Sequence, residues 1–311
     1  MTPVKQEFNV VIIGGGPAGM ASALWCSELG LNAVLFDKED HLGGQLTIIH
    51  NPIRNYLGID ASNGSELLER FLRSLKDSRF ELQTAAAIEK VDLVRRKLVL
   101  AEGAEYSGTA IVVATGVRRR TLGVPGEAEF RGKGILRSGA ESKDEIVGKT
   151  VVIVGGGDAA FENALMLSEK AKKVFVVHRR DEFSAREEFF RNARGKANIE
   201  FVLNSRVREI AGNTTVTAVD VQDTLSGTVS RVDTDAVLIR IGVEPNNEVF
   251  REQLACDAKG YILVDNRCRT SVENVYAVGD IASPVSPTIS TAVGMAATAV
   301  KAIKRRLSGS E

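Results

Sequence analysis

The sequence predicts an α/β protein with two Rossmann-like dinucleotide-binding domains, each a doubly wound, three-layer arrangement of helices around a parallel sheet. Two observations predict this fold. A glycine-rich motif at residues 14–19 recurs at residues 155–160, an offset of 141 residues. Each copy follows a run of aliphatic, β-branched residues and precedes a stretch of helical composition, which is typical of a βαβ unit. The length of 311 residues suits two domains of ordinary size.

Both copies show the same order of expected elements: a strand, the glycine turn, a helix and a second strand. The ranges are 11–13, Met20 to Leu29 and Asn32 to Phe36 in the first copy, and 152–154, Phe161 to Lys170 and Lys173 to Val177 in the second. Strands that are apolar on both faces suit a parallel sheet covered by helices on each side.

Two later apolar strands, at Ala110 to Val113 and Val275 to Val278, resemble those of the first domain. The second copy is therefore expected to be an insertion. We expect a split first domain at residues 1–117 and 245–311, and an inserted second domain at residues 118–244. A closing helix is expected from Thr288 to Leu307, with the basic residues of its last turn favouring its C-terminus.

Composition excludes several function classes. Forty basic residues balance 40 acidic ones, so no net charge points to nucleic acid or to a lipid surface. No apolar run is long enough for a membrane span, and no export signal is evident, which favours a cytoplasmic protein. Only three cysteines occur, at positions 26, 256 and 268, and their wide spacing argues against a disulfide framework and against a metal site.

The first glycine motif predicts a dinucleotide site. Gly14 permits the tight turn, Gly16 lets a diphosphate approach the backbone, and Gly19 allows close packing of the helix. The helix N-terminus supplies free N–H groups and partial positive charge. Asp37, at the end of the next strand, can accept hydrogen bonds from ribose hydroxyls. A turn that binds no ligand is the alternative.

The second motif carries the opposite charge at the corresponding strand end. The offset of 141 residues places His178, Arg179 and Arg180 where the first copy has Asp37. Paired guanidiniums can hold a 2′-phosphate, which a carboxylate would repel, so this site is expected to take NADPH in preference to NADH. A solvated charge run is the alternative for the arginines.

With these motifs placed, the whole chain resembles the low-molecular-weight thioredoxin reductase family of flavoproteins. The matching segments follow the order of that family: residues 14–19, 43–46, 55–58, 114–116, 155–160, 178–180, 241–246 and 279–280. The resemblance implies FAD in the split domain, NADPH in the inserted domain, and a homodimer.

The resemblance and the motifs together give two sets of expected site residues. For FAD they are Gly14, Gly16, Pro17, Ala18, Gly19, Asp37, Gly44, Gln45, Asn55, Ala114, Thr115, Gly116, Gly279 and Asp280. For NADPH they are Gly155, Gly157, Asp158, Ala159, His178, Arg179 and Arg180. His50 is a weaker candidate, as a proton donor to the flavin.

One departure from the family is large. Its members carry a C-x-x-C pair shortly before the second glycine motif, and the equivalent positions here are Ser138 and Glu141. A hydroxyl and a carboxylate cannot cycle between dithiol and disulfide. We therefore expect electrons to pass from the flavin directly to an acceptor, and expect the three cysteines to be buried and inert.

The sequence leaves the acceptor open. Ferredoxin, flavodoxin, a quinone, oxygen, or a disulfide such as that of thioredoxin are candidates. The alternatives are a disulfide reductase that uses a thiol of a partner, a member linked to ferredoxin or to a second flavin that no longer uses NADPH, and a non-enzymatic flavoprotein. Two pair-less relatives fit imperfectly: ferredoxin-NADP reductases carry an aromatic C-terminal extension, and bacillithiol-disulfide reductases a cysteine in the first glycine motif.

Overall fold

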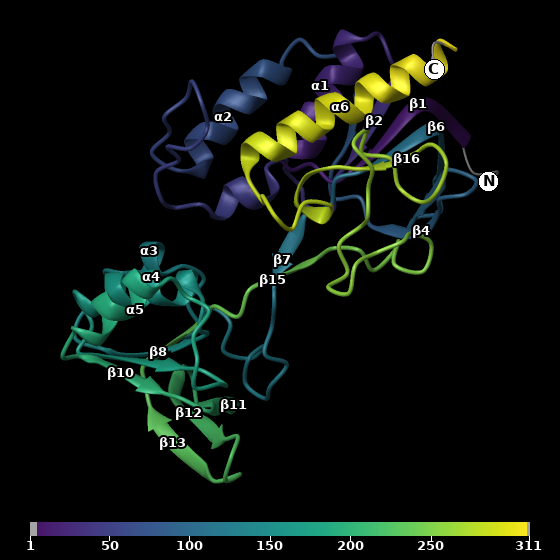
Figure 1. The fold of residues 1–311 in the computed structure, drawn as a ribbon. Coiled ribbons are helices and arrows are strands. Elements are labelled where there is room, and N and C mark those ends of the chain that lie inside the picture. The colour runs from purple at the N-terminus through teal and green to yellow at the C-terminus, as the bar shows by residue number, and fades with distance from the viewer. Residues whose placement is uncertain (1–4, 310–311) are drawn as a thin grey trace. The chain divides into compact units, whose positions relative to one another are not determined.

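The computed structural model describes residues 5–309 and divides the chain into two compact units (Figure 1). We refer to the part up to Arg118 together with the part from Glu244 onward as the split unit. The inserted unit is Arg119–Val243. Within residues 5–309, every helix is too short or too polar to cross a lipid bilayer.

The split unit is built on a seven-stranded sheet of order β3-β2-β1-β6-β5-β4, with β16 also paired to β6. Strands β1, β2, β3, β6 and β16 run parallel, whereas β4, β5 and β6 form an antiparallel meander. The strands are β1 Lys5–Ile13, β2 Ala33–Phe36, β3 Glu81–Gln83, β4 Ile88–Asp92, β5 Lys97–Leu100, β6 Glu105–Val113 and β16 Val275–Ala277.

The last four residues of β1, Val10 to Ile13, are buried, and their side chains point alternately to the two faces of the sheet. Val10 and Ile12 contribute to the apolar cluster that contains the helices α1 and α6, whereas Val11 and Ile13 face a cluster with residues of the meander. This explains the unbroken apolar run before Gly14. The helices of this unit are α1 Pro17–Glu28, η1 Gly44–Ile48, α2 Gly64–Leu75, η2 Gly279–Ile281 and α6 Ile289–Leu307.

The inserted unit has three layers. A parallel sheet of order β10-β9-β8-β14 lies between the helices and an antiparallel sheet of order β11-β12-β13. Val151 and Ile153 of β8 pack with residues of α4, and Val152 and Val154 pack with residues of β11 and β12. The elements are α3 Gly139–Ser142, β8 Thr150–Val154, α4 Asp158–Ser168, β9 Lys173–Val177, α5 Glu187–Arg194, β10 Ile199–Val202, β11 Ser205–Gly212, β12 Val216–Asp223, β13 Val229–Asp233 and β14 Ala236–Ile239.

The chain passes between the units through two short strands, β7 Val117–Arg119 and β15 Val243–Pro245, which pair with each other. On the split-unit side, Arg118 forms ion pairs with Glu244, at 2.8 Å, and with Glu248. The two connecting segments are thus tied together by backbone and charge.

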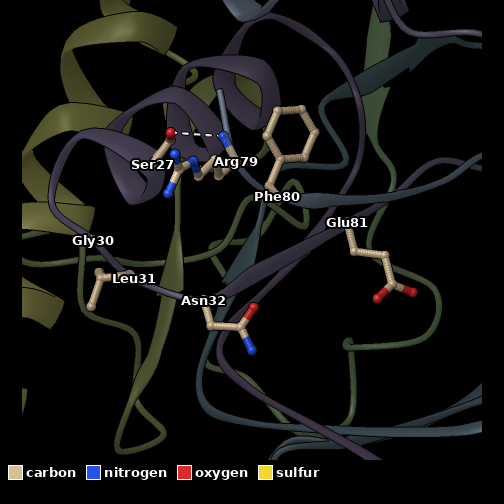
Figure 2. A pocket seen from close by; sticks show the side chains of 7 residues that line it. All are labelled: Ser27, Gly30, Leu31, Asn32, Arg79, Phe80 and Glu81. Carbon is tan, nitrogen blue, oxygen red and sulfur yellow. Dashed lines mark hydrogen bonds between the residues drawn. The ribbon is translucent and has the colours of Figure 1, made fainter. Parts of the chain in front are cut away.

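A cavity of about 430 Å³ lies at the amino ends of β2 and β3 in the split unit (Figure 2). Asn32 precedes β2, Glu81 begins β3, and the Arg79 N–H donates to the Ser27 hydroxyl at 2.8 Å. Ligands of open parallel sheets bind at the opposite, carboxyl edge of the strands. The carboxyl edges of the two parallel sheets are therefore the places where a dinucleotide is expected.

Candidate functional site

The predicted FAD residues of the split unit gather at the carboxyl edge of its parallel strands. β1 ends before Gly14, β2 before Asp37, β6 before Ala114, and β16 shortly before Gly279. Because these strands are neighbours and run parallel, segments far apart in the sequence meet at one edge. The sheet topology therefore brings together the glycine motif, Asp37, residues 114–116 and residues 279–280.

The first glycine loop leaves its backbone open beside Gly16. A Cβ on Gly14, whose φ is +109°, would lie 2.4 Å from the Ala114 carbonyl oxygen, and one on Gly19 would lie 1.7 Å from the Gly14 oxygen. A Cβ on Gly16 would meet only the Gly44 Cα, at 3.9 Å. Gly14 and Gly19 are thus required for the turn itself. Gly16 leaves room next to the N-terminus of α1, where Pro17 is the first helical residue.

Asp37 is fixed to this loop by hydrogen bonds. One carboxylate oxygen accepts the Gly15 N–H at 2.5 Å, and the other accepts the Glu39 N–H at 2.8 Å. The carboxylate therefore bridges the end of β2 and the glycine loop. Its position beside the loop suits an acceptor of ribose hydroxyls.

Asp280 is half-buried and has no hydrogen-bond or ion-pair partner within residues 5–309. Burial raises the pKa of its carboxyl group above the usual value. Gly279, with φ +75°, places its Cα so that an added Cβ would lie 2.9 Å from the Ala18 side chain of α1. Asp280 therefore lies in a short turn, η2, whose first residue packs against the start of α1.

Hydrogen bonds fix Gly43, Gln45 and Thr115 in place, and one of these bonds joins Gly43 to the glycine loop. The Gly43 N–H donates to the Gly15 oxygen at 2.9 Å, and the Gln45 side chain donates to the Val117 oxygen at 2.7 Å. The Thr115 hydroxyl donates to the Asn246 oxygen at 2.8 Å, while the Asn246 side chain donates back to Thr115. The anchoring role of Asn246 was not predicted, although the residue closes one of the matching segments.

The remaining predicted residues of the split unit, His50 and Asn55, do not lie at the carboxyl edge of the sheet. Asn55 and His50 are exposed on the segment that joins η1 to α2, rather than at a strand end. Their roles beside a flavin stay predictions.

The glycine loop of the inserted unit repeats the first with one change. A Cβ on Gly155, with φ +151°, would lie 2.2 Å from the Arg240 oxygen. Gly157 has open space, since an added Cβ would meet only the Ser184 hydroxyl at 3.6 Å. Ala160 occupies the position that Gly19 holds in the split unit, and it is fully buried. Ala159, beside it, lies in the first turn of α4.

His178 is a packing residue of this loop. A Cβ on Gly156 would lie 2.4 Å from its ring, and its Nε2 lies 3.0 Å from the Glu182 oxygen. Burial, and to a lesser degree the charges of Arg179 and Arg180, hold the pKa of the imidazole below its usual value. The ring therefore supports the loop in its neutral form at neutral pH.

Arg179 and Arg180 are exposed, and neither guanidinium has a partner within the described part of the chain. Sequence reasoning missed Arg186, which contacts the second glycine motif. The Arg186 N–H and side chain each donate to the Asp158 carboxylate at 2.8 Å. The Arg186 guanidinium neutralises the carboxylate of Asp158, the one acid of the second glycine motif. The two residues are 28 positions apart, so no local sequence pattern indicated the pair.

Glu141 lies on the short helix α3 of the inserted unit, and Ser138 directly precedes this helix. Ser138 is the N-terminal cap residue, and its carbonyl accepts the Ser142 N–H at 3.1 Å. A Cβ on Gly139 would lie 2.1 Å from the Asn163 side-chain oxygen, so α3 packs closely on α4. The segment is a helical turn with an exposed carboxylate at Glu141.

The three cysteines, all within residues 5–309, form no disulfide; Cys26 and Cys268 are buried as predicted, whereas Cys256, contrary to the prediction, is only partly buried. Burial raises the pKa of Cys26 to about 12 and that of Cys268 to about 11, and it also raises the pKa of Cys256. Their thiols are therefore protonated at neutral pH, and a protonated thiol is a poor nucleophile.

Comparison with known proteins gives a consistent result. The family model described as pyridine nucleotide-disulphide oxidoreductase matches residues 8–299. Thioredoxin reductase from Bacillus subtilis is 33% identical over 301 residues, covering 96% of this chain and 95% of its own length. The crystal structure of Lactococcus lactis thioredoxin reductase has a TM-score of 0.82 at 28% identity, covering 97% of this chain and 99% of that one.

A second solved structure, the thioredoxin reductase of T. acidophilum, has a TM-score of 0.80 at 28% identity, with 97% and 99% coverage. The agreement over almost the whole length confirms the predicted fold of two Rossmann-like, doubly wound α/β domains.

Proposed function

The chain belongs to the pyridine nucleotide-disulphide oxidoreductase family, as a member of the low-molecular-weight thioredoxin reductase type, and on this premise we propose that it oxidises NADPH without a protein-borne thiol pair. It is an FAD-containing, NADPH-dependent oxidoreductase of that type. The observation that carries the proposal is the cysteine set: three residues, at positions 26, 256 and 268, with none at positions 138 and 141.

The split unit is the proposed FAD domain and the inserted unit the proposed NADPH domain. When bound, FAD would take a hydride from NADPH and release the electrons to an acceptor, as two single electrons or as a hydride. The residues of the chain bind and orient the two dinucleotides. These assignments follow from the two carboxyl-edge sites and from the charge at each strand end.

The residues of the split unit fit FAD. The open backbone beside Gly16 and the N-terminus of α1 suit a diphosphate. Asp37, already oriented by the Gly15 N–H, is placed to accept ribose hydroxyls. Asp280 has a carboxyl group with no partner in residues 5–309, which a ribityl or ribose hydroxyl would satisfy.

The residues of the inserted unit fit NADPH. Gly157 leaves room at the N-terminus of α4, and the Arg186 pair offsets the charge of Asp158 there. Arg179 and Arg180 present two guanidiniums without a carboxylate partner in the described residues. Such forks bind a 2′-phosphate with charge-assisted hydrogen bonds.

The absence of a cysteine pair at positions 138 and 141 supports a direct transfer of electrons from the flavin to the acceptor. A thiol relay needs two sulfurs that alternate between dithiol and disulfide. Here the relevant positions carry a hydroxyl and a carboxylate, and the cysteine thiols elsewhere have raised pKa values. The acceptor would therefore receive its electrons without passing through the sulfur chemistry of this chain.

The acceptor and the assembly belong to the same proposal. Ferredoxin, flavodoxin, a quinone and a disulfide are the candidate acceptors, and a homodimer in the cytoplasm is the proposed state. A disulfide reductase that borrows a partner thiol is the main rival, since the similar proteins from B. subtilis and L. lactis are named thioredoxin reductases. A member that no longer uses NADPH and a non-enzymatic flavoprotein are the others.

Anaerobic reduction tests the entry of electrons. NADPH mixed with the FAD-loaded protein should bleach the visible flavin absorbance at a one-to-one ratio, and NADH should do so far more slowly. Ferredoxin, flavodoxin, quinone, oxygen and thioredoxin, offered in turn, would then be ranked by the rate at which the absorbance returns. A yellow protein that NADPH leaves unbleached would exclude the proposal in favour of a non-enzymatic flavoprotein or a member with another donor.

A cysteine-free variant tests whether electrons pass from the flavin to the acceptor without a thiol. Cys26→Ala, Cys256→Ser and Cys268→Ser combined should keep the reoxidation rate with the preferred acceptor within about twofold, because no thiol takes part. Each single variant provides a control for folding, measured as flavin content per chain. A hundredfold loss of acceptor reduction with normal flavin content would instead favour a relay through one of these thiols.

A further inference from the structure

Three arginines of the inserted unit lie together at the carboxyl edge of its parallel sheet. Arg240 follows the last residue of β14, and its N–H donates to the Val154 oxygen of β8 at 2.7 Å. The segment before Arg137 runs along β14, with the Leu136 N–H donating to the Val237 oxygen at 2.8 Å. Arg119 ends β7.

The guanidiniums of Arg119 and Arg240 share one acceptor. Both donate to the Arg137 carbonyl oxygen, Arg240 at 3.2 Å, and Arg240 also donates to the Ile239 oxygen at 2.8 Å. Two positive groups therefore lie side by side on a single neutral oxygen. Arg137 itself adds a third charge, which acts on Arg119.

No carboxylate within residues 5–309 compensates these charges. None of the three guanidiniums forms an ion pair in this part of the chain, whereas neighbouring Arg118 pairs with Glu244 and Glu248. Burial and then the charge of Arg119 lower the pKa of Arg240 to about 10. Burial and then the charge of Arg137 lower the pKa of Arg119. An anion bound between them would offset both effects.

We propose that Arg119, Arg137 and Arg240 form an anion site for the electron acceptor, which would carry a carboxylate, phosphate or sulfonate group. The inference rests on the proposed function. Guanidinium forks match these planar or tetrahedral anions. Arg137 directly precedes Ser138, so the site adjoins the segment that takes the place of the redox pair.

The nucleotide is the other conceivable source of the anion. Its phosphates already have suitable groups in Arg179, Arg180 and the N-terminus of α4. We therefore assign the three arginines to an anionic group of the acceptor and not to a phosphate of the cofactor. Saturating the nucleotide site first distinguishes the two.

Calorimetry with inorganic phosphate tests binding without turnover. In the FAD-loaded protein saturated with NADP⁺, we expect phosphate to bind with millimolar affinity and to bind about tenfold more weakly to Arg119→Gln or Arg240→Gln. Arg208→Gln, which removes an exposed charge on β11, is the matched control and should bind as the wild type does. Unchanged affinity in both cluster variants would overturn the site.

Kinetics with two acceptors test the role in catalysis. Arg119→Gln should lower kcat/KM for a disulfonated anthraquinone about tenfold and leave that for a neutral benzoquinone unchanged. An equal loss for both acceptors would overturn the assignment. A rise in the Kd for NADPH with an unchanged kcat/KM for the sulfonated quinone would also overturn it, because the three arginines would then bind the diphosphate of the cofactor.

Thermal unfolding separates binding from a structural role. Phosphate should raise the Tm of the wild type and of Arg208→Gln, and should leave that of Arg240→Gln nearly unchanged. An equal rise in all three proteins would count against the site. If NADPH failed to bleach the flavin, the proposed function would fail, yet the calorimetry would still decide whether this anion site exists.

Discussion

The two glycine loops of this protein share one backbone plan and differ in the residues at the end of the next strand. In the split unit this strand end carries Asp37, whose carboxylate bonds the Gly15 N–H at 2.5 Å. In the inserted unit it carries His178, whose neutral ring packs against Gly156, and then two arginines without a partner in the described chain. One βαβ frame thus carries a carboxylate at the first strand end and two guanidiniums at the second, and we predict that this difference selects a nucleotide with a 2′-phosphate at the second site.

The loops also differ in how tightly the helix approaches the turn. A Cβ on Gly19 would lie 1.7 Å from the Gly14 oxygen, whereas Ala160 at the equivalent position is buried without such a conflict. The first helix thus lies closer to its own loop. This difference can be tested by exchanging the two residues.

Gly19→Ala should have the largest effect. The added methyl group cannot coexist with the Gly14 oxygen, so the loop must shift, at a cost of roughly 3 kcal/mol or more in the free energy of unfolding. Ala160→Gly, the reciprocal change, should cost only about 1 kcal/mol. Urea unfolding gives both values, and flavin content per chain reports on the loop. Equal costs would show that the two helices approach their loops alike.

Arg179→Ala and Arg180→Ala should have the next largest effect. Each charge-assisted hydrogen bond contributes on the order of 1.5–3 kcal/mol, so the KM for NADPH should rise about ten- to a hundredfold. The KM for NADH should change little, because NADH has no 2′-phosphate. Arg194→Ala, an exposed arginine at the end of α5, is the control. Equal changes for both nucleotides would contradict the charge reversal between the two sites.

The smallest expected effect is a pH dependence at His178. Because the pKa of this imidazole is lowered in the folded protein, the unfolded chain binds more protons as the pH falls. The contribution of His178 to the free energy of unfolding is therefore complete above the usual pKa of 6.5. It is lost as the pH falls through the lower pKa of the imidazole in the folded protein. His178→Asn should flatten the decrease of Tm between about pH 7.5 and 5.5.

His41 of the split unit provides the opposite sign. Its hydrogen bond with Asp40 raises its pKa, so its contribution is present below the usual value and is lost as the pH rises through the folded one. In His41→Asn, the decrease of Tm at acid pH should therefore be the same as in the wild type or slightly steeper. A parallel change in both variants would indicate that neither histidine is responsible.

Local sequence indicated much of the two dinucleotide sites. The repeat at Gly14 and Gly155 placed both βαβ units, because the turn, the strand and the helix are contiguous in the chain. Asp37 and His178 could be found by counting from these turns. Asn246 and Arg186 could not, since each acts on a residue that pairing and packing bring close, Thr115 and Asp158.

The antiparallel sheets were not predicted either. Strands β11 and β12 mix buried and exposed residues in short runs, and β13 has no buried residue. In β4, charged residues separate the two apolar ones, and β5 has only three apolar residues. Such short patterns do not identify a strand by themselves, because the burial of their apolar residues depends on the neighbouring sheet against which they pack. Val207 and Val219 are buried because they pack with Val152 and Val154 of β8.

The sequence by itself determined the paired glycine motifs, the reversal of charge after the second strand of each, and the lack of a cysteine pair, because these depend on residue type and short spacing. Only the tertiary structure left Asp280 without a partner in residues 5–309 and placed the guanidiniums of Arg119 and Arg240 on one carbonyl oxygen. These two arginines are about 120 positions apart in the chain, the first at the end of β7 and the second directly after β14, so only the packing of these segments brings their guanidiniums together.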